Sequence, residues 1–111
     1  MIAASTESDV VEAVRAARAH RRTLEIVGAG TKRAFGRAAP CDDVLDVSGL
    51  SGIVKYEPSE LILTVFPGTP VAEIAALLAE KNQRLGFEPA DWGPLLGASA
   101  GKATIAGVLS A

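Results

Sequence analysis

The segment Ile26–Gly36, IVGAGTKRAFG, runs from a short apolar stretch directly into a cluster of glycines. The overlapping residues Thr23–Val27 are β-branched and apolar enough to predict a strand. Glycines directly behind a strand allow positive φ angles and a close approach of the backbone to a ligand, and successive N–H groups in such a turn can form a concave anion site. The residues alone leave two interpretations open: an anion-binding turn, or a plain turn without a ligand.

The sequence argues against a dinucleotide-binding fingerprint in this segment. Gly28 and Gly30 match the first half of G-x-G-x-x-G, but Arg33 stands where the third glycine belongs. The Rossmann loop also leads into a helix whose N-terminus receives the pyrophosphate, and residues 37–40, RAAP, leave too little helix for that. What remains is a glycine-rich turn that does not continue as a helix.

The later segment GASAGKAT, residues 97–104, does not match a P-loop. Three residues separate Gly97 from Gly101 where the motif has four, and Ala103 follows Lys102 where the motif requires serine or threonine. Without that hydroxyl, a magnesium ion would lose its protein ligand. The sequence therefore argues against a nucleoside triphosphatase.

The N-terminal region predicts a helix over Glu7–His20. Thr6 followed three residues later by Asp9 resembles a capping box, although aspartate replaces the preferred glutamate. The helix is followed by the predicted strand and then by the glycines. The face expected to be buried carries Val10, Val11, Val14 and Ala17.

The middle of the chain predicts an antiparallel hairpin over Ile53–Glu57 and Leu61–Phe66. The residues PGTP then open a second helix, with Thr69 as the expected N-cap and Pro70 at the first helical position, where its missing N–H costs nothing. The preceding turn, Pro67-Gly68, is expected to be structural. The predicted buried stripe of this helix comprises Val71, Ile74, Ala75 and Leu78.

From Gly86 onward the chain is rich in glycine and proline and predicts a long irregular loop, which at such length usually has a function. Trp92 in this loop is expected to anchor it to the domain. Glu88 and Asp91 are expected to be a turn signal and solvated carboxylates. Taken together, the elements predict one α+β (mixed α/β) domain.

The composition is that of a globular protein, with 49% hydrophobic and 22% charged residues, and the net charge of −2 argues against nucleic acid as a partner. Arg15, Arg18, Arg21 and Arg22 are expected to form a solvated helix face. Because Cys41 is the only cysteine and His20 the only histidine, neither an internal disulfide nor a metal site is expected, and redox chemistry would need an organic cofactor. The sequence predicts neither a signal peptide nor a transmembrane segment, and a cytoplasmic location.

Three segments in order, VGAGTKRAFG, PGTPVAEIAALLAEKNQRLGFEP and ATIAGVLSA, resemble the FAD-binding domain of the vanillyl-alcohol oxidase and p-cresol methylhydroxylase (PCMH) superfamily. Within it, GAGTK followed by glycine, together with LGFEPAD, most resembles the FAD-binding subunits of bacterial glycolate oxidases. The resemblance covers nearly the whole chain from Thr23 on. It implies the first lobe of a PCMH-type domain plus the start of the second, with a small β-sheet flanked by two helices.

The resemblance also implies a set of cofactor-binding residues. In that family the first loop holds the FAD pyrophosphate through backbone amides, and a later A-T-I-G-G segment lies against the cofactor; Ala106 here replaces the first glycine of that pair. Lys32 is expected either near the phosphate or pointing into solvent. FAD is expected to be bound non-covalently, and Cys41 to be a bystander. The expected binding residues are Gly28, Ala29, Gly30, Thr31, Lys32, Gly36, Thr104, Ile105, Ala106 and Gly107.

By the same resemblance, the chain is expected to be the N-terminal portion, residues 1–111, of a larger FAD-binding domain. The implied function is oxidation of glycolate to glyoxylate in a heteromeric complex with a second flavoprotein and an iron–sulfur subunit, through which it could associate with a membrane. No catalytic residue is identified. Two alternatives stay open: a free-standing FAD-linked oxidase for another hydroxy acid, sugar or alcohol, and a scaffold without cofactor, which Ala106 favours and the intact GAGT opposes.

Overall fold

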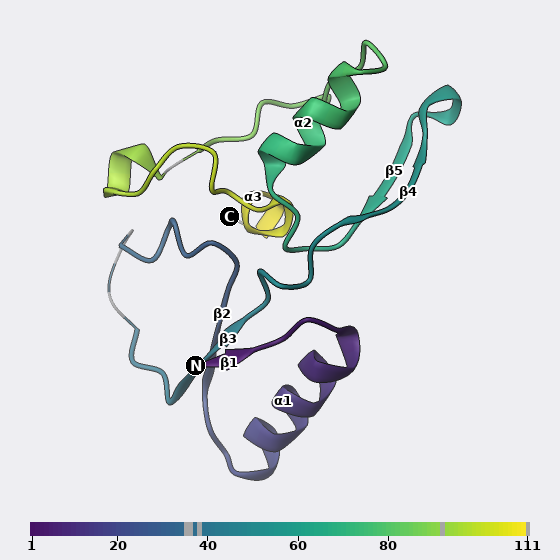
Figure 1. The fold of residues 1–111 in the computed structure, drawn as a ribbon. Coiled ribbons are helices and arrows are strands. Elements are labelled where there is room, and N and C mark those ends of the chain that lie inside the picture. Colours follow the sequence, from purple (N-terminus) through teal and green to yellow (C-terminus); the bar gives the residue numbers. More distant parts are fainter. Residues whose placement is uncertain (35–36, 38, 92, 111) are drawn as a thin grey trace.

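The described residues form two small β-sheets and three α-helices (Figure 1). The structure is a computed structural model and describes residues 1–34, 37, 39–91 and 93–110. The expectations for Gly36 and Trp92 therefore lie outside the described residues. The molecule is flattened, with extents of 48 × 33 × 17 Å. The mixed class agrees with the prediction, but the structure has one more sheet and one more helix than expected.

The N-terminal half contains a parallel sheet with one helix between its first two strands in the chain. The elements are β1 (Ile2–Ala3), α1 (Glu7–Ala19), β2 (Leu24–Val27) and β3 (Asp43–Asp46), and β3 lies in the middle of the sheet. Because the strands are parallel, their carboxyl ends share one edge, and the glycine-rich turn begins there, directly after β2. Strand β1 was not predicted, since two residues carry no periodicity.

Helix α1 begins as predicted. The Thr6 hydroxyl accepts a hydrogen bond from the Asp9 N–H, and the Asp9 carboxylate accepts one from the Thr6 N–H, each at 3.1 Å, which confirms the capping box. The predicted buried face is partly wrong, because Val11 and Val14 are 40% and 46% exposed. Ala17 is buried as predicted, and Ala13, which was not predicted, is also buried.

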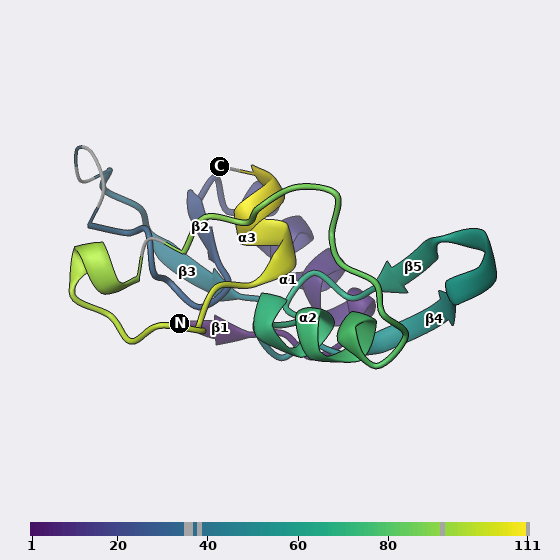
Figure 2. The same ribbon diagram turned by 90° about the horizontal axis from the view of Figure 1, so that it is seen from above.

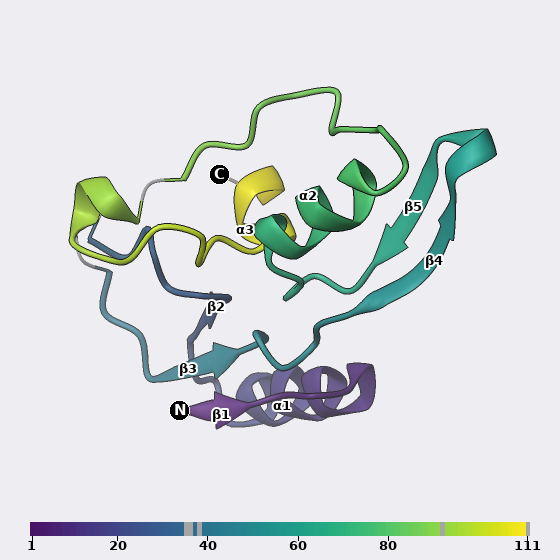
Figure 3. The ribbon, with the colours of Figure 1, turned by 45° about the horizontal axis from the view of Figure 1, so that its top comes forward.

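The small side chains let α1 lie close to the sheet. Ala13 packs in one cluster with Leu45 of β3, which is fully buried, and with Ala4 and Leu50. Figure 3 shows α1 lying alongside β1. A face of valines would hold the helix farther from the strands, so close packing has selected the alanine face.

The second sheet is the predicted hairpin. Strands β4 (Ile53–Glu57) and β5 (Ile62–Val65) pair antiparallel and are joined through a 3₁₀ turn at Pro58–Glu60. Helix α2 (Val71–Ala79) follows, and its Ile74 and Leu78 form the core of this half. The predicted stripe is otherwise confirmed, except that Ala75 is exposed.

Thr69 does not cap α2, which corrects the prediction. The cap position belongs to Pro70, and no side chain caps the helix. The Thr69 hydroxyl is fully buried and donates to the Phe66 carbonyl oxygen at 2.7 Å, while it accepts from the Gly52 N–H at 3.0 Å. Its partners therefore come from the hairpin side of the turn, so Thr69 joins β4 and β5 to the start of α2.

The predicted irregular loop from Gly86 is interrupted by a 3₁₀ turn at Pro94–Leu96 and ends in α3 (Ile105–Ser110), which was not expected. The Val71 N–H donates to the Ala103 carbonyl, and the Ile105 N–H donates to the Thr69 carbonyl, each at 2.9 Å. These two bonds join the segment just before α3 to the residues at the start of α2. Figures 2 and 3 show the resulting place of α3, between β2 and α2.

Candidate cofactor-binding site

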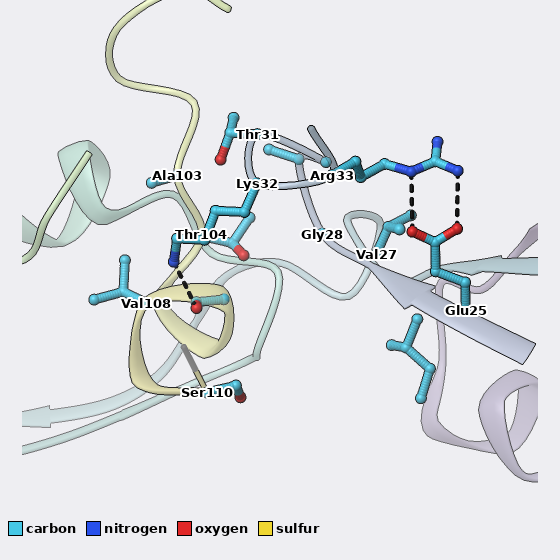
Figure 4. A pocket seen from close by; sticks show the side chains of 14 residues that line it. Glu25, Val27, Gly28, Thr31, Lys32, Arg33, Ala103, Thr104, Val108 and Ser110 are labelled. Carbon is cyan, nitrogen blue, oxygen red and sulfur yellow. Dashed lines mark hydrogen bonds and ion pairs between the residues drawn. The ribbon is translucent and has the colours of Figure 1, made fainter. Parts of the chain in front are cut away.

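A cavity of about 310 Å³ lies where the glycine-rich turn after β2 meets the start of α3 (Figure 4). Strand β2 supplies one wall, the turn supplies the second, and the segment from Ala103 to Ser110 supplies the third. The lining includes seven of the predicted binding residues: Gly28, Ala29, Gly30, Thr31, Lys32, Thr104 and Gly107. It also includes Glu25, Ile26, Val27, Arg33, Ala103, Val108 and Ser110.

The glycine-rich turn lines this cavity from Gly28 to Lys32. Within the described part of the chain, no N–H group from Gly28 to Lys32 donates a hydrogen bond. Gly30 has φ of +70°, the left-handed conformation that glycine adopts without strain, and its carbonyl accepts from the Arg33 N–H at 3.5 Å. Unpartnered polar groups are unfavourable unless water or a ligand satisfies them. The run of amides therefore has the capacity to bind an anion.

The turn and α3 approach each other so closely that glycine is needed at the contact. A Cβ atom on Gly28 would lie 2.5 Å from Thr104 Oγ1, and one on Gly107 would lie 3.1 Å from the same oxygen. Thr104 itself is only 6% exposed. The two glycines thus allow the threonine hydroxyl to sit between the turn and the helix at the wall of the cavity.

Lys32 lines the cavity and is bonded to the protein, and whether it also lies near the phosphate stays a prediction. Its Nζ donates to the Gly107 carbonyl oxygen at 2.9 Å and so ties the turn to α3 (Figure 4). A lysine that donates to a neutral carbonyl keeps its positive charge near the cavity, but one of its three N–H donors is then used in a bond to the protein. Its first role in this structure is to hold two walls of the cavity together.

A second tie, which the sequence analysis did not find, joins Glu25 to Arg33. Arg33 Nε lies 3.0 Å from Glu25 Oε1, and Arg33 Nη2 lies 2.8 Å from Glu25 Oε2, so the pair is bidentate (Figure 4). The Glu25 side chain is 32% exposed and the Arg33 side chain is 49% exposed. The signal available in the sequence was a carboxylate just before the glycines and an arginine just after them.

Two predicted binding residues, Ile105 and Ala106, are not among the residues that line the cavity. The side chain of Ile105 packs in the core with Ile74 and Leu78, and its N–H is bonded to Thr69. The Ala106 N–H donates to the Pro67 carbonyl oxygen at 3.2 Å. Gly36 lies outside the described residues. The backbone amides of Ile105 and Ala106 are therefore already satisfied by protein, and their contact with a cofactor stays a prediction.

No group of three or more histidine, cysteine, aspartate or glutamate side chains among the described residues is arranged to hold a metal ion. No helix among them is long and apolar enough to cross a membrane.

The sequence profile of the FAD binding domain family matches residues 1–110. The chain therefore belongs to this family of FAD-binding domains, and FAD is its cofactor.

Among proteins of known identity, the chain is 37% identical over 84 residues to glycolate oxidase subunit GlcE of Escherichia coli (strain K12), a match that covers 76% of this chain and 24% of GlcE. Among solved structures, p-cresol methylhydroxylase with substrate bound matches with a TM-score of 0.65 and 24% identity, over 85% of this chain and 20% of that one. The chain thus spans about a quarter or less of each relative's length. The structural match confirms the predicted PCMH-type fold.

Proposed function

We propose that this chain is the FAD-binding part of a glycolate oxidase subunit and that the amides from Gly28 to Lys32 hold the FAD pyrophosphate. The observation that carries the proposal is a run of amides without partners among the described residues, in a turn that lines a cavity at the carboxyl end of β2. Successive N–H groups in a turn form an anion site without a helix dipole. The identity with GlcE supports the particular oxidase, since it includes this part of the family fold.

The remaining walls suit the rest of the cofactor. Thr31 and Thr104 place hydroxyl groups beside the amides, and Ile26, Val27 and Val108 give the cavity an apolar side. Ile26 is 64% exposed, although it is a large apolar side chain. An apolar wall with a few polar groups is the usual composition of a cofactor site.

We propose that the cofactor is held without a covalent bond. The single histidine and the single cysteine of the sequence, His20 and Cys41, are not among the residues that line the cavity. His20 lies at the C-terminal end of α1, and the Cys41 thiol is exposed and contacts the Ala39 carbonyl. Binding therefore rests on hydrogen bonds and packing.

The proposed reaction is oxidation of glycolate to glyoxylate. FAD, when bound, supplies the electron acceptor, while the protein positions it and sets its electrostatic surroundings. Among the described residues around the cavity, the only charged side chains are Glu25, Lys32 and Arg33, and all three are bonded to protein groups. The proposed role of this chain's residues is therefore to bind and orient the pyrophosphate end of FAD.

The substrate site and the partners are also part of the proposal. We place the catalytic base and the substrate-binding cations in other parts of the oxidase. The proposed partners are a second flavoprotein and an iron–sulfur subunit. The proposed location is the cytoplasm, with any membrane association made through those subunits. In this account residues 1–111 are the N-terminal portion of a larger FAD-binding domain. The 24% share of GlcE that the chain matches supports this assignment.

The test is the visible absorbance of the purified intact protein before and after acid precipitation. Flavin absorbance that moves to the supernatant, with FAD identified there by chromatography, is expected. Flavin that stays in the pellet would contradict non-covalent binding, and colourless protein that takes up no added FAD would favour the scaffold. Dye reduction by the assembled oxidase with glycolate, compared with other hydroxy acids, sugars and alcohols, tests the substrate.

A further inference from the structure

Arg33 makes three kinds of contact near the glycine-rich turn, two with Gly30 of the turn and one with Glu25 of β2. Its N–H donates to the Gly30 carbonyl, its guanidinium makes the bidentate pair with Glu25, and its aliphatic stem covers Gly30, since a Cβ atom there would lie 3.3 Å from Arg33 Cδ. No other residue of the described turn makes contacts of all three kinds. Arg33 therefore fixes the conformation of the turn from its C-terminal side.

Glu25 holds the same turn from its N-terminal side. It lies in β2, whose backbone is paired with β3, with Glu25 opposite Val44. The bidentate pair consequently connects the rigid strand before the turn to the first residue after the unpartnered amides. Between the two lie residues 26–32, which include both glycines of the turn.

We propose that the Glu25–Arg33 ion pair is a clasp that preorganises the amides of Gly28–Lys32 for the FAD pyrophosphate, so that both are positioning residues. The inference rests on the proposed function, because it assigns a role toward the same anion. A turn with two glycines has many accessible backbone conformations, and ordering it on binding would cost affinity. A clasp that orders the turn beforehand removes part of that cost.

The alternative role for Arg33, as a cation that binds the phosphate directly, makes the opposite prediction. In that case Glu25 competes with the phosphate for the guanidinium and adds like-charge repulsion at the cavity wall. Removing the Glu25 charge would then strengthen FAD binding, whereas removing one half of a clasp weakens it. The sign of one substitution therefore separates the two roles.

The experiment is a titration of the intact apoprotein with FAD, followed by flavin fluorescence, for wild type and Glu25→Gln. The clasp predicts affinity about three-fold weaker in the variant, in the range that exposed ion pairs contribute. The control is Glu57→Gln, which breaks the ion pair between Lys55 and Glu57 in β4, 3.1 Å apart and away from the cavity, and should leave the affinity unchanged.

Two further measurements separate positioning from a general loss of structure. Riboflavin lacks the pyrophosphate, so its weaker binding should not change in Glu25→Gln, whereas a damaged fold would lower the affinity for both flavins. The charge-exchanged double variant Glu25→Arg/Arg33→Glu should recover FAD affinity relative to either single charge reversal. The double variant tests the clasp even if Glu25→Gln does not fold.

The outcomes are distinct. Wild type that binds no FAD would overturn the proposed function and the clasp together. Wild type that binds FAD, with Glu25→Gln binding equally or more tightly, would overturn the clasp alone. Failure of the exchanged pair to recover affinity would also overturn it.

Discussion

Adding one methyl group to the turn, by Gly28→Ala, should weaken FAD binding because it separates the two walls of the cavity. The new Cβ would lie 2.5 Å from Thr104 Oγ1 and 3.2 Å from Thr104 Cγ2, whereas ordinary contact begins at 3.4 Å. Thr104 cannot retreat easily, since the N–H of the next residue is bonded to the Thr69 carbonyl and Thr104 is 6% exposed.

The cost follows from the packing. Forcing an extra methyl group into a well-packed site costs about 1–3 kcal/mol. If opening of the cavity relieves the strain, that energy appears as affinity weaker by about five- to one-hundred-fold, at 1.4 kcal/mol for each factor of ten. Rotation of the Thr104 side chain is the cheapest alternative relief, and branching at Cβ restricts its χ1 rotamers.

The assay is the Kd for FAD of the intact protein, with two companion variants. Gly86→Ala is the matched control, because no atom lies within 4 Å of its added Cβ. The double variant Gly28→Ala/Thr104→Ala removes both clashing atoms and should bind FAD more tightly than Gly28→Ala. The reasoning would be refuted if Gly28→Ala bound FAD as well as Gly86→Ala, or if the double variant bound no better than Gly28→Ala.

Two further predictions concern stability. Thr69→Val keeps the shape of the side chain but leaves the Gly52 N–H without its partner, which should lower the free energy of unfolding by about 1–3 kcal/mol; an unchanged urea midpoint for the intact protein, with Thr69→Ser as the hydroxyl-retaining comparison, would contradict this. The Ser5 N–H, and next Thr6, lower the pKa of Asp9 from its ordinary value of 3.8. The folded-state pKa of Asp9 lies below its unfolded-state pKa. The stability that the ionised carboxylate contributes is therefore complete above the unfolded-state pKa and is lost as the pH falls through the folded-state pKa. The difference in free energy of unfolding between wild type and Asp9→Asn should therefore become smaller in acid. A difference that does not change with pH would show that the carboxylate does not act in this way.

The features predicted correctly from the sequence depend on neighbouring residues. The capping box needs only Thr6 and Asp9, the hairpin needs two apolar runs around Pro58–Glu60, and the glycine-rich turn follows its strand directly. The contiguous residues Gly28–Lys32 also line one cavity, and their role in binding FAD stays a prediction. Local signals of this kind survive folding because their partners are fixed by the chain itself.

The features that were missed depend on distant partners. Strand β1 exists because Ile2 and Ala3 pair with Leu45 and Asp46, and α3 follows a segment that is bonded to the start of α2. The buried face of α1 was partly mistaken because valine is more apolar than alanine, yet the helix buries Ala13 and leaves Val11 and Val14 exposed.

The ties within the site were missed for the same reason. Lys32 reaches the Gly107 carbonyl across 75 positions of the chain, and nothing in the sequence near Lys32 indicates that partner. The Glu25–Arg33 pair spans eight positions but needs the turn to fold back on its strand. Sequence reasoning identified the amides that offer the anion site, and the structure added the side chains that hold them in place.

The most direct test of the central claim is a crystal structure of the intact protein with FAD bound. The account predicts that pyrophosphate oxygens lie within hydrogen-bond distance, about 2.7–3.2 Å, of several amide nitrogens from Gly28 to Lys32, with Arg33 still on Glu25. A pyrophosphate bound elsewhere, with these amides left to solvent, would contradict it.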